Sequence, residues 1–203
     1  EPIKSIGLEV EAYHEDKPAT EAPLQQVVVE KNTTLNTEIP MFTHLHVHTQ
    51  FSVLDGLSKI PVLLKKAKAN GMTTVAITDH GNMFGAKSFH QAAVEAEIKP
   101  ILGCEVYVAR RGMEKKESKV DASGWHLILL AKNLAGYKNL LLLVSAGWTK
   151  GYYYKPRIDK DLLRKHHEGL IALSACLGGE IPSKIVNEGV EKAEESLLEY
   201  KAI

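Results

Sequence analysis

The sequence lacks most of the features that mark secreted, membrane-spanning or nucleotide-loop proteins. It holds two cysteines in 203 residues, Cys104 and Cys176, which does not suit a disulfide-stabilised secreted scaffold. No apolar run approaches the roughly 18 residues of a membrane span, and no signal peptide is visible. Glycine-rich phosphate loops and internal repeats are also missing. These absences lead us to expect a protein of the reducing cytoplasm with no membrane partner.

Charge is balanced overall but uneven along the chain. The 25 basic and 25 acidic residues cancel, so no general attraction to nucleic acid is indicated. Residues 1–40 contain eight acidic and three basic residues, which leaves 17 acidic and 22 basic residues in the remainder. This mild basic excess would suit a phosphate-bearing partner, although ordinary surfaces vary as much. A hydrophobic share of 44% is typical of a soluble domain with a core.

The pattern divides the chain into an irregular first part and a regular second part. Residues 1–40 contain four prolines and no steady periodicity, which predicts an extension or linker. We expect one domain over 41–203. Its periodicity predicts strands at 42–48, 73–78, 101–109, 126–131 and 170–175. Helices are predicted at 58–70, 85–96, 134–147, 159–165, 181–187 and 191–202. Strands that alternate with helices predict parallel βαβ units, hence an α/β fold and an incomplete (βα) barrel.

Potential metal ligands follow several of these strands. His46 and His48 lie two residues apart and should share one face of their strand, with Leu45 and Val47 turned into an apolar layer. Barrels collect their chemistry at the carboxyl ends of strands. His126 is the exception, because it begins its predicted strand and so lies at the wrong end unless the barrel is distorted. The other candidates at this rim are Asp55, Asp79, His80, Glu105 and Cys176.

These side chains are too many for a single ion. Imidazole, carboxylate and thiolate groups predict a cluster of two or three divalent ions, with zinc expected first and manganese or iron as alternatives. Glu105 is the candidate bridging ligand, and Asp79 is expected to orient a neighbouring histidine. Such clusters suit phosphoester hydrolysis, in which we expect Asp79, His80 and Glu105 to be catalytic. The alternative is a surface strand with scattered histidines.

Several residues outside the expected metal cluster have other predicted roles, and the role of one loop is open. Cys104 points away from Glu105 and is predicted to be a core thiol. His90 is expected on a helix surface, and His44 on the flank of its strand. The loop at 151–157 contains Lys155 and Arg157 beside three tyrosines. It could stack bases and bind phosphate, or it could pack onto a neighbouring domain.

The same motifs resemble a known family. His46-x-His48 with Asp55-Gly56, Thr78-Asp79-His80-Gly81 and Gly103-Cys104-Glu105, together with His126 and Cys176, resemble the PHP (polymerase and histidinol phosphatase) superfamily. The runs at 44–56, 77–81 and 152–159 resemble in particular the amino-terminal domain of bacterial DNA polymerase III alpha subunits. The likeness extends from Met41 to the end of the sequence.

The resemblance implies a distorted (βα)₇ barrel with a trinuclear metal site. Of nine family ligands, seven have counterparts: His46, His48, Asp55, His80, Glu105, His126 and Cys176. The remaining Asp-x-His pair has none, so the carboxyl-terminal part of the domain and the polymerase domains are expected to be missing here, and metal binding to be weaker than in a whole domain.

The resemblance also implies a parent DNA-directed DNA polymerase and its partners: DNA, the polymerase domains of the same chain and replisome subunits such as a proofreading exonuclease. The domain itself could be a metal-dependent 3′–5′ exonuclease, or an inert scaffold that docks such a subunit. A free small-molecule phosphatase is a third possibility, which the polymerase-like 152–159 loop disfavours.

Overall fold

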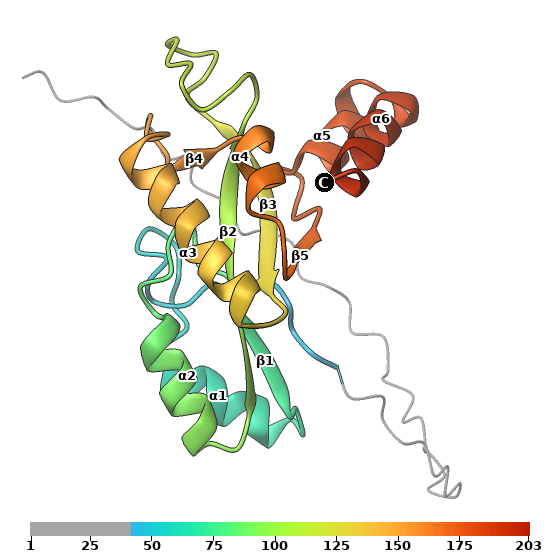
Figure 1. Ribbon diagram of the computed structural model, residues 1–203. Coiled ribbons are helices and arrows are strands. Elements are labelled where there is room, and N and C mark those ends of the chain that lie inside the picture. Colours follow the sequence, from blue (N-terminus) through green and yellow to red (C-terminus); the bar gives the residue numbers. More distant parts are fainter. Residues whose placement is uncertain (1–41) are drawn as a thin grey trace, which may run out of the picture. The chain divides into compact units, whose positions relative to one another are not determined.

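The computed structural model describes residues 42–203, so the predicted extension at 1–40 lies outside it. The described part is a mixed α/β unit in which helices flank one sheet (Figure 1). The α/β class therefore agrees with the sequence prediction. The elements in chain order are α1 (Ile60–Ala69), β1 (Thr74–Ile77), α2 (Ala86–Glu95), β2 (Lys99–Ala109), β3 (Gly124–Ala131), α3 (Leu134–Thr149), β4 (Arg157–Ile158), α4 (Lys160–Lys165), β5 (Leu170–Leu173), α5 (Glu180–Asn187) and α6 (Val190–Lys201).

The long strand β2 is central to the sheet, because it pairs with β1, β3 and β4 (Figure 1). Its first residues pair in parallel with β1, and Tyr107 and Val108 pair in parallel with β4. Between these two partners, His80 forms an isolated parallel bridge to Glu105. On the other edge β2 pairs with β3, which pairs in turn with β5. A single strand therefore connects the segments that carry most of the candidate ligands.

The prediction that all strands run in parallel is wrong for β3. This strand pairs antiparallel with β2, with Tyr107 opposite His126. The residues between them, 110–123, contain no helix, and a chain that returns without a crossover must pair antiparallel. The start of β3 consequently lies beside the end of β2. His126, which a parallel arrangement would misplace, therefore lies at the same rim as Glu105.

Alternation along β2 separates the core from the candidate site. Side chains of successive strand residues point to opposite faces. Cys104 is fully buried in a core cluster with Leu140 and Leu143 of α3, which confirms its prediction as a core thiol. Glu105 and Tyr107 occupy the opposite face. A second core cluster forms where α1 and α2 pack beside β1; its buried members are Ile60, Leu64, Ala67, Val75, Ile77, Phe89, Ala93 and Ile98.

The predicted strand at 42–48 is not a regular strand. Two carbonyl groups of this segment accept backbone hydrogen bonds. Ala76 N of β1 donates to His44 O at 3.0 Å, and Thr78 N, just after β1, donates to Val47 O at 2.8 Å. The step from His44 to Val47 is three residues, whereas the step from Ala76 to Thr78 is two. The 42–48 segment therefore carries one extra residue, which interrupts regular strand pairing as a β-bulge does. The Thr78 hydroxyl accepts from Val47 N instead (2.8 Å). Leu45 is 36% exposed and does not enter an apolar layer, contrary to prediction.

Candidate metal centre

Glu105 lies at the centre of the candidate site. Its side chain is buried, and both carboxylate oxygens face histidines. Oε2 lies 2.8 Å from His46 Nε2 and 3.5 Å from His48 Nε2. Oε1 lies 2.8 Å from His80 Nδ1 and 2.9 Å from His126 Nδ1. One carboxylate thus touches two groups of imidazoles, which is the arrangement that a bridging ligand requires.

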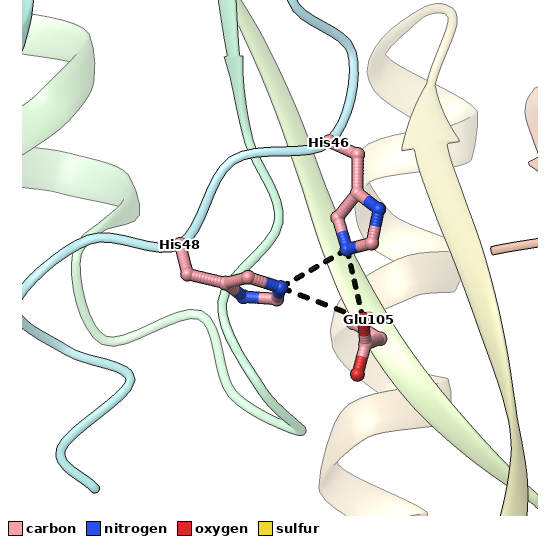
Figure 2. A group of neighbouring side chains, drawn as sticks. All are labelled: His46, His48 and Glu105. Carbon is pink, nitrogen blue, oxygen red and sulfur yellow. Dashed lines mark hydrogen bonds and ion pairs between the residues drawn. The ribbon is translucent and has the colours of Figure 1, made fainter. Parts of the chain in front are cut away.

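The first group of donors has the spacing of a metal site. His46 and His48 project from one irregular segment toward Glu105 on β2 (Figure 2). Their Nε2 atoms lie 3.0 Å apart, and the three donor atoms fall within 4.8 Å of one another. Two ligands at about 2.1 Å from one tetrahedral ion would lie roughly 3.4 Å apart. These residues therefore fit a divalent ion in both donor type and spacing.

The second group surrounds the other oxygen of Glu105. His126 Nδ1 lies 3.6 Å from Cys176 Sγ, a distance that suits a nitrogen and a sulfur on one ion. Asp55 is 62% exposed and reaches His80 Nε2 at 3.1 Å. The rings of His48 and His80 stack with centroids 3.9 Å apart, which joins the two groups. All seven ligands that the resemblance implied therefore lie in one contact network.

Local backbone geometry positions two of these ligands. Gly81 has a φ of +61°, and a Cβ there would lie 2.6 Å from Pro156, so the turn after His80 needs glycine. Ala175 also has a positive φ (62°) although it carries a Cβ. Such conformations are held by their surroundings and concentrate at functional sites. Ala175 turns the chain immediately before Cys176, where β5 has ended.

The electrostatics of the centre favour an ionised carboxylate. Burial opposes ionisation of Glu105, but hydrogen bonds from His126, His48 and His80 outweigh it and hold the pKa of Glu105 far below its usual value. The pKa of His80 is raised, mainly by its hydrogen bond to Glu105 and against the effect of burial. The carboxylate is thus available as an anionic ligand at neutral pH.

Asp79 was predicted to orient a neighbouring histidine. Its carboxylate contacts no histidine directly and instead accepts hydrogen bonds from the hydroxyls of Thr49 and Ser52. Its buried carboxylate accepts from Thr49 N at 2.6 Å, from Thr49 Oγ1 at 2.8 Å and from Ser52 Oγ at 2.8 Å. Ser52 Oγ in turn lies 3.4 Å from His48 Nδ1 and accepts from His80 N at 3.1 Å. Asp79 therefore fixes the loop that presents the histidines and is too enclosed to touch a substrate.

We expect Asp79→Asn to weaken metal binding by roughly 10- to 100-fold, the usual effect of losing a group that supports ligands. The amide cannot accept all three hydrogen bonds, so the free energy of unfolding should also fall by about 1–3 kcal/mol. Metal titration and urea denaturation measure the two effects. Asp161→Asn, at an exposed aspartate on α4, is the matched control. Equal metal affinity in Asp79→Asn and the parent would contradict this role.

The structure separates the two basic residues that were predicted to contact phosphate. Lys155 lines a pocket together with Asp55 and His80, which suits such a contact. Arg157 is fully buried, and its guanidinium donates to the carbonyls of Gly151, Asp121, Met113 and Lys115. Arg157 therefore stabilises the loops around it and cannot reach a ligand, so its prediction as a phosphate contact is wrong.

Sequence reasoning missed several residues at this rim. Tyr107 lies on the same face of β2 as Glu105, and its ring centroid is 5.2 Å from that of His126. The period of two in strands could have revealed it. Thr49 and Ser52 had no comparable signal. His44 and His90 are exposed and do not belong to the donor network described above.

The residues of this site lie within a segment that matches a known family and known proteins. The PHP domain family model matches residues 44–203. A DNA polymerase III subunit alpha from Borreliella burgdorferi is 50% identical over 163 residues, which cover 80% of this chain and 14% of that protein. The corresponding subunit from Thermus aquaticus is 48% identical over 166 residues, again 80% of this chain and 14% of the relative. The chain thus spans about one seventh of the length of these relatives.

Similarity to solved structures is weaker. A protein described as a metal-dependent phosphoesterase from Bifidobacterium adolescentis is 22% identical, with a TM-score of 0.36 over 54% of this chain and 35% of that chain. A score of this size carries no conclusion about function. The match of the family model covers most of the chain, including every donor residue described above. The chain therefore belongs to the PHP domain family.

Proposed function

We propose that this chain is the amino-terminal PHP domain of a bacterial DNA polymerase III alpha subunit, and that its rim hydrolyses DNA as a multinuclear metal-dependent 3′–5′ exonuclease. The observation that carries the proposal is the engagement of both Glu105 oxygens by histidines from separate segments. The names of the relatives support a parent DNA-directed DNA polymerase. Because the chain spans a small part of those proteins, the polymerase activity belongs to the proposal as well.

The residues of the rim suit phosphodiester hydrolysis. Bound divalent ions would supply an activated water and would neutralise charge on the phosphoryl oxygens. Glu105 holds the two donor groups together, while the hydroxyl network of Asp79 keeps the histidine loop in place. The Lys155 ammonium lies 5.4 Å from the centroid of the Tyr107 ring, at the edge of the site. A cation there can bind and orient a phosphate of the DNA backbone.

An inert scaffold is the second candidate, and one observation favours it. The donors come from segments between His46 and Cys176, so bound metal would link distant parts of the chain and stabilise the fold without turnover. In that case the domain would support the polymerase domains and dock a separate proofreading exonuclease subunit in the cytoplasm. Zinc suits the mixed histidine, carboxylate and thiol donors best, with manganese and iron as alternatives. Among residues 42–203, no helix is long and apolar enough to cross a membrane.

Metal removal distinguishes the two candidates. We expect the full-length subunit, freed of metal by a chelator and then supplied with zinc or manganese, to release nucleotides from the 3′ end of single-stranded or mismatched DNA labelled at its 5′ end. Release should stop when the chelator returns and should be lost in His48→Ala. If metal raises the melting temperature of the subunit but no nucleotide is released, the scaffold is correct and the exonuclease is not.

A further inference from the structure

A pocket opens directly beside the metal centre. It encloses about 420 Å³, within the range of roughly 300–1,000 Å³ that small-molecule sites occupy. One side is formed by Asp55, His80 and His126, which belong to the donor network. Lys155 and several aromatic residues belong to the rest of the lining. We call four of these aromatic residues the aromatic wall: Phe84, Trp148, Tyr152 and Tyr154.

The aromatic wall is attached to the metal centre by a hydrogen bond. Trp148 Nε1 donates to Gly81 O at 2.7 Å, and Gly81 directly follows His80. The rings of Trp148 and Tyr152 are stacked, with centroids 5.5 Å apart and planes 18° apart. The ring centroid of Phe84 lies 6.5 Å from that of Trp148. The wall therefore has a defined position relative to the ligand His80.

The wall is not used by the core of the described domain. Phe84 is 67% exposed, Tyr152 48% and Trp148 44%. A group of large exposed aromatic rings usually marks a binding surface. Lys155 adds a cation near the donors, because it lies over the ring of Tyr107, which in turn lies beside His126. Aromatic rings, a cation and metal ligands thus line a single pocket.

We infer that the aromatic wall stacks the base of the 3′-terminal nucleotide, while Lys155 contacts the phosphate next to the metal centre. This inference rests on the proposed function and adds to it the recognition of an unpaired base. Every base has a π-face, so stacking on such a wall tolerates any sequence. A base held in a duplex cannot reach the wall without unpairing. The wall therefore selects frayed or mismatched 3′ ends over paired ones.

Fluorescence of a terminal base analogue tests this subsite without relying on hydrolysis. The full-length subunit is mixed with single-stranded DNA that ends in 2-aminopurine, joined by a phosphorothioate to slow cleavage. We expect quenching on binding, because stacking quenches this base. The double variant Phe84→Leu/Tyr152→Leu should abolish the quenching and weaken binding by roughly 5- to 100-fold, as expected for a lost base–aromatic stack. Phe42→Leu, at an exposed phenylalanine outside the pocket, is the matched control, and Tyr152→Phe should keep the quenching.

DNA that ends in an abasic nucleotide completes the test. The parent protein should bind it roughly 5- to 100-fold more weakly than base-ended DNA, whereas the double variant should bind both equally. If the parent protein quenches the fluorescence of the terminal base but releases no nucleotide, the base-stacking subsite is supported and the exonuclease activity is contradicted. If it releases nucleotides but neither quenches the fluorescence nor binds the abasic end more weakly, the exonuclease activity is supported and the base-stacking subsite is contradicted. In that case the wall packs against another protein surface.

Discussion

Replacing Glu105 by glutamine is expected to remove most of the bound metal and to lower hydrolysis by at least about 10³-fold. The carboxylate contacts both sets of histidines, one set through each of its oxygens. Glutamine has nearly the same shape but no negative charge, and its amide nitrogen cannot act as a ligand. Losing several kcal/mol of metal-based stabilisation corresponds to a rate loss of this size, at 1.36 kcal/mol for each factor of ten.

Metal content after dialysis and nucleotide release measure this effect in the full-length subunit. His90→Gln is the matched control, because His90 is exposed on α2 and should leave both quantities unchanged. Circular dichroism establishes that the Glu105→Gln variant is folded. Unchanged metal content in a folded Glu105→Gln variant would contradict the bridging role, even if hydrolysis were lost.

Replacing Arg157 by lysine should lower the free energy of unfolding by about 3–5 kcal/mol, as disruption of a buried charged network does. The guanidinium donates to four carbonyl oxygens from 2.9 to 3.2 Å away. A lysine ammonium is a compact point donor and cannot reach all four. The unpaired carbonyls, belonging to the 110–123 loop and to Gly151, would then remain buried. Burial lowers the pKa of Arg157, but the side chain stays protonated at neutral pH.

Urea denaturation, with the slope unchanged, measures this loss. Lys155→Gln is the matched comparison on the same loop. Lys155 contributes a partly exposed cation–π contact to Tyr107, so its loss should cost less than about 1 kcal/mol while weakening DNA binding. The opposite result, a stable Arg157→Lys that binds DNA poorly, would restore Arg157 as a phosphate contact.

Local patterns identified the donors, while long-range pairing decided how they meet. The two-residue spacing of His46 and His48 predicted that they share one side of their segment, and both do face Glu105 although the segment is not a regular strand. The direction of β3 was not accessible, because 14 residues between two strands can form either a hairpin loop or a crossover. The sequence shows that Arg157 is charged but not that its charge is enclosed. Likewise, nothing local revealed the extra residue between His44 and Val47 that interrupts the strand.

The register of the antiparallel pair β2 and β3 determines which side chains of β3 face the metal centre. A shift of one residue in this register would turn His126 toward α3 and leave a core side chain facing Glu105. Residues 110–123 connect the two strands beyond their last pair, Ala109 with Gly124. Insertions there would lengthen the hairpin without moving a single donor. The length of this loop can therefore change wherever the carbonyls of Met113, Lys115 and Asp121 still reach Arg157, whereas β2 and β3 must keep a fixed count of residues.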